Sequence, residues 1–529
     1  MASKSRVKNS FLNLITGFGG HVLTLVLDFI VRTVFIYTLG KQYLGINGLF
    51  SDILSMLSLA NLGIGTAIVY RLYAPLANKD LHRVKILVKF YKLAYRLIGI
   101  LIFGLGLLVI PFLPLLIKDY PTLADRGINA VQLFILYLLN SASSYWFLAY
   151  RTSVINANQE RYLIQIFNII THILTSITKI IILIFIKDFM VYTASGIGIG
   201  IAVSLIRGGY AKKLHPEFFE NEPDSLNKQE ISELFKDCGA LFVYKINHVV
   251  IKASDTMVLS AFIGLGAVGM YSNYLLFYNT CVTLFGQILT SFKASLGNLY
   301  STATAKVRYR YFKITTFLMA VIFGTAAVGI AVCANELISV WIGKDYVIPQ
   351  PLPVLIGVEL YFAGILDNLG QVRHVSGVFR QMWFRPILSA IVNIVVSIVL
   401  ARFWGVCGVT LGTIAAFVLT NYLIDPRLIY KYTFENYKPV SDYYKSSLTY
   451  LGILSLICTA DLFICSHVFT GYGWLSVALH IFLTGISVPA VFAVLFWNTD
   501  ECKYLRKTVN RILQKAKHKF HQHRIDTTT

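Results

Sequence analysis

Apolar runs of about 20 residues alternate along the chain with short polar connections. A helix rises about 1.5 Å per residue, so a run of this length crosses the ~30 Å hydrocarbon core of a bilayer. The pattern predicts about 14 membrane-spanning helices, near residues 11–38, 44–70, 93–117, 128–150, 163–186, 189–207, 238–263, 267–292, 314–342, 350–371, 385–404, 406–426, 447–469 and 474–497. We therefore expect an all-α polytopic membrane protein.

The composition supports this class. The chain has 529 residues, of which 56% are hydrophobic and 14% are charged, whereas about a quarter of the residues of a soluble protein are charged. The net charge of +21 is spread between the apolar runs, so we expect no nucleic-acid partner. The seven cysteines form no CxxC or Cys/His pattern, which predicts free thiols and no metal site.

The basic residues also predict the orientation of the chain. With the N-terminus inside, most of the 47 Lys and Arg residues fall in the inner connections, and the outer connections hold Lys41, Lys118, Arg126, Lys187, Lys344 and Arg402. Basic residues concentrate on the cytoplasmic side of membrane proteins, so we expect both termini to be cytoplasmic. The basic tail, residues 500–529, is interpreted as an amphipathic helix on anionic lipid or, equally well, as a solvated end.

Two parts of the chain resemble each other. The segment HVLTLVLDFIVRTVFI, which starts at His21, aligns with HVVIKASDTMVLSAFI, which starts at His248, and further along Gly45 aligns with Gly269. LLIKDYP, from Leu115, also resembles WIGKDYVIP, from Trp341. These matches predict two parallel six-helix lobes around a central cavity, which is a transporter architecture.

The predicted organisation then follows from the repeat. Residues 1–208 form an N-lobe of spans 1–6, and residues 209–237 form a cytoplasmic connection. Residues 238–430 form a C-lobe of spans 7–12. Residues 431–499 supply two extra C-terminal helices, spans 13 and 14, and the basic tail follows.

Charged residues lie inside the predicted spans. In YKINHVVIKASDTMVLSAF, residues 244–262, the side chains of Lys245, His248, Lys252 and Asp255 fall within an arc of about 80° on one helix face. A charge at the bilayer centre costs at least ~2.5–3.5 kcal/mol, so it usually faces a polar cavity. Two alternatives remain: Lys245 snorkels to the inner surface, and Lys252 and Asp255 form a purely structural i, i+3 pair.

The first span mirrors this stripe with His21, Asp28 and Arg32, and Lys179 lies deep in span 5. The cations Arg32, Lys179, Lys245 and Lys252 suit an anionic headgroup such as a pyrophosphate. We expect them to bind substrate. The remaining four polar residues are candidates for charge pairs or for a coupling ion: Asp28, Asp255, His21 and His248.

The sequence provides no evidence for catalysis. It contains no HExxH, GxSxG, Walker-type or DxD motif, and none of the predicted outer connections is long enough to form a folded domain. We therefore expect a protein that is not an enzyme and has no catalytic residues. The alternative from the enzyme class is a membrane-embedded polysaccharide polymerase or acyltransferase.

The predicted spans, the two lobes, the first span with Asp28 and the phrase SDTMVLSAFIGLGAVGMYSNY, residues 254–274, resemble one known family. It is the polysaccharide transporter family of the multidrug/oligosaccharidyl-lipid/polysaccharide (MOP) superfamily. The resemblance implies a flippase of the bacterial cytoplasmic membrane that moves undecaprenyl-pyrophosphate-linked oligosaccharides for capsule, exopolysaccharide or O-antigen synthesis. It also implies no cofactor, coupling to an H⁺ or Na⁺ gradient, and a polysaccharide polymerase and other assembly proteins as partners.

Two sister families offer alternatives. A lipid II flippase shares the 14 spans and the cationic cavity, and charge alone does not separate it from the first interpretation. A drug/cation antiporter of the same fold typically has 12 spans and an acidic cavity, which fits this chain less well.

Overall fold

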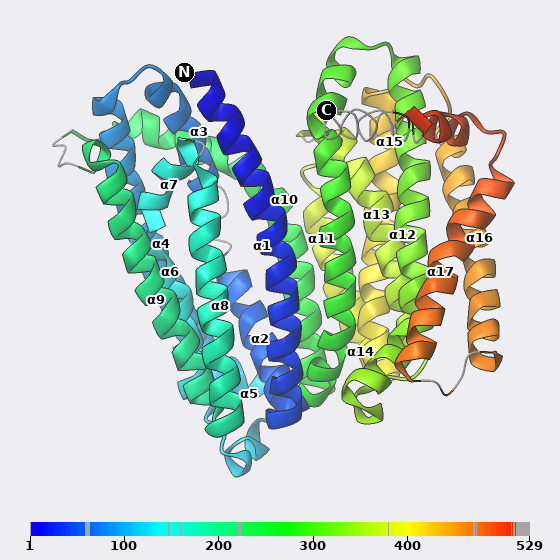
Figure 1. Ribbon diagram of the computed structural model, residues 1–529, viewed down its shortest axis with the longest axis horizontal. Helices are drawn as coiled ribbons and strands as arrows, with labels where there is room; N and C mark the ends of the chain where they lie inside the picture. Colours follow the sequence, from blue (N-terminus) through cyan, green and yellow to red (C-terminus); the bar gives the residue numbers. More distant parts are fainter. Residues whose placement is uncertain are drawn as a thin grey trace, which may run out of the picture. The chain divides into compact units, whose positions relative to one another are not determined.

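The computed structural model is a bundle of long α-helices, with no strand in the described part of the chain (Figure 1). It describes residues 2–58, 64–146, 149–158, 160–219, 224–378, 380–468, 471, 473–508, 510–511 and 514. Within these ranges it describes no side chain for residues 2–15, 17–18, 64–70, 126, 149, 228, 234–248, 288–295 and 380. The predicted all-α membrane class is confirmed.

The chain forms two compact units, Met1–Ser272 and Asn273–Thr529. The helices that begin in unit 1 are α1 (Ala2–Leu39), α2 (Lys41–Leu57), α3 (Ile64–Ala77), α4 (Leu81–Val109), α5 (Leu113–Leu116), α6 (Ala130–Trp146), α7 (Ala149–Ala157), α8 (Arg161–Phe185), α9 (Phe189–Leu214), α10 (Lys228–Phe262) and α11 (Leu265–Thr302). Those of unit 2 are α12 (Ala305–Ile342), α13 (Leu352–Ser376), α14 (Arg385–Ala416), the π-helix η8 (Phe417–Tyr422), α15 (Leu423–Tyr432), α16 (Ser441–His467) and α17 (Trp474–Leu495). The division between the two units falls inside α11. The lobe boundaries at residues 208, 238 and 430 stay a prediction.

Nine helical segments of the described residues are long and apolar enough to cross a membrane. The number is ten if the bent pair of α6 and α7 is one span. The predicted number of about 14 is therefore not confirmed.

The segment from α14 to α15 counts as one span in this total, although α14 is a hairpin. Gly405 has a φ of 54° and a ψ of −128°, and the amide of Asn393 donates to the hydroxyl of Thr413 at 3.0 Å. A straight helix would separate these two residues by about 30 Å. The chain therefore turns back at RFWG, where the sequence predicts a connection between two spans.

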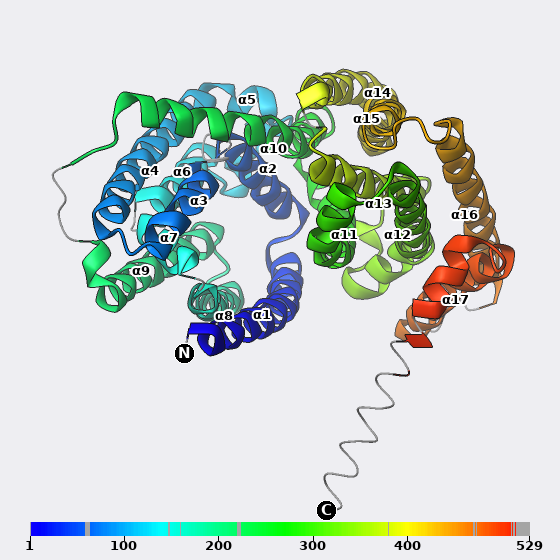
Figure 2. The ribbon, with the colours of Figure 1, turned by 90° about the horizontal axis from the view of Figure 1, so that it is seen from above.

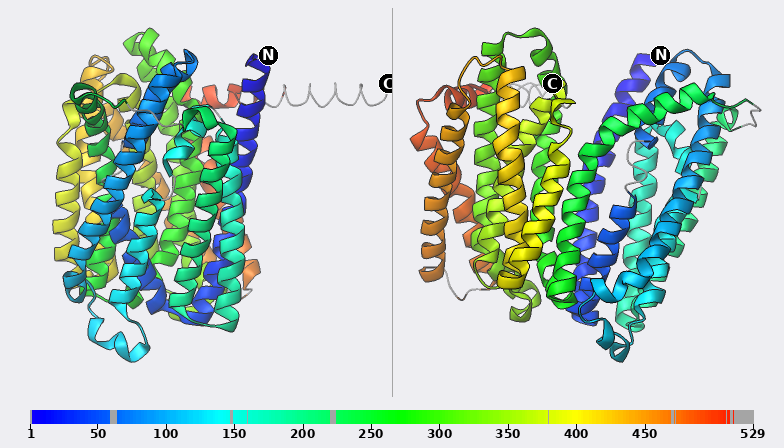
Figure 3. Two further views of the ribbon diagram at one scale, coloured as in Figure 1. Left: turned by 90° about the vertical axis from the view of Figure 1, so that its left-hand side faces the viewer. Right: turned by 180° about the vertical axis from the view of Figure 1, so that it is seen from behind.

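In unit 1, α1 lies alongside α8, and α10 packs against α2 and α3 (Figure 2). Figure 3 shows α10, in green, running obliquely across this unit. The helix begins at Lys228, ten residues before the predicted span, because a capping box stabilises its start: Asn227 and Glu230 each accept the other's backbone N–H. The predicted connection 209–237 therefore contains the end of α9 and the first turns of α10.

The turn between α10 and α11 is held by the segment that follows α5. The ammonium of Lys118 donates to the carbonyl of Phe262 at 3.0 Å, and its N–H donates to the carbonyl of Ser260 at 3.1 Å. The carboxylate of Asp119 accepts the N–H of Leu265 at 3.3 Å. A cation thus lies at the C-terminus of one helix and an anion at the N-terminus of the next, the favourable arrangement for both helix dipoles.

The starts of α2 and α11 touch through their backbones. A Cβ atom at Gly45 would lie 1.9 Å from the carbonyl oxygen of Leu265, and one at Gly269 would lie 2.1 Å from the carbonyl oxygen of Lys41. The contact is reciprocal, because residues 41 and 45 correspond to residues 265 and 269 at the same spacing along the chain. This symmetry supports the repeat, in which Gly45 aligns with Gly269.

Candidate functional site

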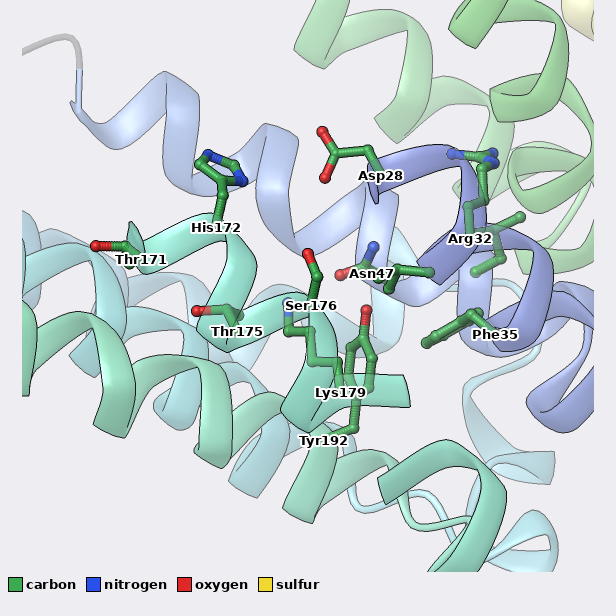
Figure 4. Close-up of a pocket in the computed structure, with 12 residues that line it drawn as sticks. Asp28, Arg32, Phe35, Asn47, Thr171, His172, Thr175, Ser176, Lys179 and Tyr192 are labelled. Atoms are coloured by element: carbon green, nitrogen blue, oxygen red, sulfur yellow. The ribbon is translucent and has the colours of Figure 1, made fainter. Parts of the chain in front are cut away.

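A polar pocket of about 250 Å³ opens inside unit 1. Two of its walls come from α1 and α8, and α2 and α9 complete it (Figure 4). Its polar lining consists of Asp28, Arg32, Asn47, Thr171, His172, Thr175, Ser176, Lys179 and Tyr192, and its apolar lining consists of Val31, Phe35 and Leu44.

Helical periodicity brings these side chains together. In α1 the lining residues from Asp28 to Phe35 lie within two helical turns, and Asp28 and Arg32 are four residues apart. In α8 a stripe of hydroxyl, imidazole and ammonium groups runs from Thr171 to Lys179 over two turns. Because residues three and four apart share one helix face, the polar lining residues of each helix lie on the side that faces the pocket, and Val31 and Phe35 of α1 lie beside them.

Arg32 is fixed at the edge of the pocket by a hydroxyl group. Its Nη2 atom donates to Ser272 Oγ at 2.6 Å, and Ser272 donates in turn to the carbonyl of Gly269 at 2.7 Å. The contact connects α1 to the first turns of α11. These hydrogen bonds set the orientation of Arg32 beside the pocket.

Lys179 lies against an aromatic wall. Its ammonium group is 4.7 Å from the ring centroid of Tyr192, which is a cation–π distance. The ring of Tyr192 is held edge-on by Phe35, at a centroid distance of 5.2 Å. Gly196 leaves room for the lysine, since a Cβ atom there would lie 3.0 Å from Lys179 Cε. In the described part of the chain no carboxylate lies within 4 Å of this ammonium group.

Asp28 supplies the negative charge of the pocket. Its side chain is exposed, and it has no ion pair or hydrogen bond among the described residues. Figure 4 shows its carboxylate and the imidazole of His172 on the same side of the pocket. With neutral His172, the charges of Asp28, Arg32 and Lys179 sum to one positive charge, so the pocket suits an anionic group.

In α10, Lys252 and Asp255 do not have the common surroundings that the sequence predicts. The side chains of Lys245 and His248 lie outside the described residues. Lys252 is 46% exposed and its ammonium group is 3.7 Å from the carboxylate of Asp52 in α2, whereas Asp255 is buried at 8% exposure. The ion-pair partner of Lys252 therefore comes from another helix, and Lys252 and Asp255 do not line the pocket of α1 and α8.

The remaining predicted residue, His21, lies in α1 outside the pocket. Its Nε2 atom is buried and has no hydrogen-bond partner among the described residues. The use of His21 and Asp255 as coupling groups remains a prediction.

Sequence reasoning missed several pocket residues. His172, Thr175, Ser176 and Tyr192 line the pocket but were not candidates. The polar stripe of α8 was visible in the sequence, because Thr171 and Thr175 are four residues apart and His172 lies three residues before Thr175 and four before Ser176. Asp52 was visible too, because it is the sole acidic residue of α2. Among the described residues, no group of three or more His, Cys, Asp or Glu side chains could hold a metal ion.

Comparisons with known proteins agree with this fold. Residues 218–348 match the family described as polysaccharide biosynthesis protein. A solved structure of the lipid II flippase MurJ, in an inward closed conformation, has a TM-score of 0.65 at 16% identity and covers 92% of this chain and 99% of its own. No curated protein sequence matches the chain.

A second solved structure is an inward-facing multidrug resistance MATE family transporter of the MOP superfamily. Its TM-score is 0.58 at 11% identity, over 79% of this chain and 96% of its own. The predicted resemblance is confirmed: the chain matches the polysaccharide biosynthesis protein family in residues 218–348 and has, over most of its length, the fold of MurJ and of the MATE transporters of the MOP superfamily.

Proposed function

We propose that the protein is a flippase that moves undecaprenyl-pyrophosphate-linked oligosaccharide units from the inner to the outer leaflet of the bacterial cytoplasmic membrane. One observation carries the proposal: a pocket with an excess of positive charge lies inside an apolar helix bundle. The family match in residues 218–348 and the shared fold support it. The units would serve capsule, exopolysaccharide or O-antigen synthesis.

The pocket would bind the pyrophosphate rather than the sugars. A volume of about 250 Å³ accommodates a pyrophosphate and a few water molecules, each of which takes ~30 Å³ in the liquid, but not an oligosaccharide. Arg32 and Lys179 would replace part of the hydration of the phosphate oxygens by charge-assisted hydrogen bonds. The sugars would lie outside this pocket, and the lipid tail would stay in the bilayer.

Movement would follow alternating access between two lobes, driven by an H⁺ or Na⁺ gradient. Asp28 is the pocket's candidate for the coupling group, because its carboxylate is exposed there. Both termini would lie in the cytoplasm, where the basic tail meets anionic lipids, and a polysaccharide polymerase would receive the product. The protein would act as a transporter and not as an enzyme.

The decisive experiment measures where lipid-linked repeat units accumulate in a strain that lacks this gene. We expect accumulation on the inner leaflet, rescue by the wild-type gene, and no rescue by a variant with Arg32→Gln and Lys179→Gln. The matched control is Lys187→Gln, which removes an exposed lysine two residues beyond the end of α8. An unchanged distribution of lipid-linked units in the deletion strain would sink the proposal.

A lipid II flippase is the second candidate, and the fold shared with MurJ favours it. The two candidates differ in the sugar part of the substrate and share the pyrophosphate. Purified protein in proteoliposomes loaded separately with lipid II and with a lipid-linked repeat unit distinguishes them. Flipping of lipid II alone would replace the first proposal by the second.

A further inference from the structure

The interface between α8 and α9 carries a further cation, Arg207, outside the pocket. The two helices run side by side (Figure 1), and Arg207 lies seven residues before the end of α9. Its Nη1 atom donates to Oδ1 of Asn168 at 3.1 Å, and Asn168 lies seven residues after the start of α8. At 1.5 Å per residue, each residue is about 10 Å inside its helix. Arg207 and Asn168 therefore meet within two helices that are long and apolar enough to cross a membrane.

The charge of Arg207 meets a neutral partner. Among the described residues Arg207 forms no ion pair with a carboxylate, and its Nε atom is buried without a hydrogen-bond partner. A guanidinium donates hydrogen bonds and accepts none, so the amide oxygen of Asn168 points to Arg207 and its NH₂ group points away. A charge inside a membrane span is costly and usually faces a partner or a wet cavity. The two residues together offer N–H donors and one positive charge, which suits an anion.

The same helix interface leads from Arg207 to the pocket. Asn168 is eleven residues before Lys179 on α8, and Arg207 is eleven residues after Gly196 on α9. Eleven residues make three helical turns to within about 20°, so the two residues of each helix share one face. Lys179 and Gly196 also lie against each other, since a Cβ atom at Gly196 would be 3.0 Å from Lys179 Cε. The contact of Arg207 with Asn168 therefore repeats this interface about 16.5 Å further along the two helices.

The face of α8 between the two cations is polar. His172 lies four residues after Asn168, and Thr175 lies seven residues after it. Both line the pocket together with Lys179 (Figure 4), and residues at these spacings share one helix face. Asn168 and Arg207 are partly exposed, so a ligand can reach them. A row of polar groups thus extends from Arg207 to Lys179.

We propose that Arg207 and Asn168 form an entry site, where the anionic headgroup of the substrate binds before it moves along α8 to Lys179. The identity of this headgroup, a pyrophosphate, rests on the proposed function. In the predicted orientation the start of α8 and the end of α9 lie on the cytoplasmic side, from which the proposed flippase takes its substrate. There the guanidinium of Arg207 and the NH₂ group of Asn168 replace part of the hydration of the phosphate oxygens.

The first test counts the binding sites for inorganic pyrophosphate by isothermal titration calorimetry of the purified full-length protein in phosphatidylcholine nanodiscs. We expect two sites in the wild type, one in Arg207→Gln and one in Lys179→Gln. The matched control is Arg161→Gln, which removes an exposed arginine of α8 and should keep both sites. An Arg207→Gln variant that binds as many pyrophosphate ions as the wild type would overturn the proposal.

Asn168→Asp separates a binding role from a structural one. The change keeps the size of the side chain and places a carboxylate beside Arg207, which relieves an uncompensated charge. The unfolding midpoint should therefore hold or rise. The carboxylate also occupies the donors of Arg207 and repels phosphate, so this variant should lose one pyrophosphate site. Wild-type pyrophosphate binding in Asn168→Asp would show that Arg207 only joins α9 to α8, and the proposal would fail.

Flipping in proteoliposomes separates the entry site from the proposed function. Because the entry site acts before the pocket, Arg207→Gln should raise the concentration of lipid-linked repeat unit at half-maximal flipping about tenfold, the effect of one charge-assisted contact. The maximal rate should change little, and a fall in the maximal rate alone would contradict an entry role. If the protein flips no lipid-linked unit while Arg207→Gln still removes one pyrophosphate site, the proposed function fails and the anion site stands.

Discussion

Two charged regions of the molecule use arginine and lysine in opposite ways. In unit 2, Arg373 and Arg385 enclose Asp425, at 2.7 and 3.2 Å from its two carboxylate oxygens, and all three residues are less than 10% exposed. In unit 1, Lys179 faces a pocket and lies over a tyrosine ring. A cation with a buried carboxylate partner fastens helices together, whereas a cation that faces an opening without one is available to a ligand.

The largest expected effect comes from breaking the enclosed cluster. Asp425→Asn removes the carboxylate that Arg373 and Arg385 share and leaves two buried positive charges. Removing one partner of a buried pair costs about 3–5 kcal/mol, so we expect the free energy of unfolding to fall by that amount. Denaturant unfolding of the purified protein measures it. Wild-type stability in this variant would show that the cluster does not fasten α13, α14 and α15.

A large effect on transport, with little effect on stability, is expected at the pocket. Lys179→Gln removes a charge-assisted contact worth about 1.5–3 kcal/mol, which corresponds to a loss of roughly 10- to 100-fold in flipping rate. Flipping of a lipid-linked repeat unit in proteoliposomes measures it, with Lys187→Gln as the control. If Lys179→Gln instead lowered the unfolding midpoint as strongly as Asp425→Asn, the pocket lysine would be structural too.

A smaller effect is expected at Lys252, a cation that has a carboxylate partner but is only half buried. The lysine is about half exposed and 3.7 Å from Asp52, and exposed pairs typically contribute 0.2–1 kcal/mol. We therefore expect Lys252→Gln to lower the free energy of unfolding by less than about 1 kcal/mol and to leave flipping unchanged. A tenfold loss of flipping in Lys252→Gln would instead support the prediction from the sequence that Lys252 binds substrate.

The smallest effect is a pH dependence at the start of α10. The guanidinium of Arg83 and the N–H of Asn227 hydrogen-bond to Glu230 and lower the pKa of its carboxyl group. The stabilisation is therefore present above the ordinary pKa of about 4.3 and is lost as the pH falls through the lower folded value. We expect Glu230→Gln to remove this acid loss of stability, an effect below about 1 kcal/mol, measured as the unfolding midpoint between pH 3 and pH 7. An identical pH profile in Glu230→Gln would contradict it.

Asp28 and Arg32 show what helical periodicity can predict about the pocket from the sequence. Their i, i+4 spacing places them on one face of α1, and they line the same pocket. Lys252 and Asp255, at i, i+3 spacing, were predicted to share a face in the same way, yet one is exposed and the other is buried. Helical spacing fixes which side chains point in similar directions, but the neighbouring helices decide what each of them meets.

The apolar runs by themselves determined the helical membrane class, the break at RFWG and the presence of charges that need polar surroundings, because these depend on local hydrophobicity and chain length. The repeat predicted that Gly45 and Gly269 are equivalent, and the structure places them in one reciprocal contact. Only the tertiary structure decided that Asp52 pairs with Lys252 and that Tyr192 faces Lys179. Asp52 and Lys252 are 200 residues apart, whereas Lys179 and Tyr192 lie on two successive helices. In both cases packing between helices, which no local pattern encodes, brings the partners together.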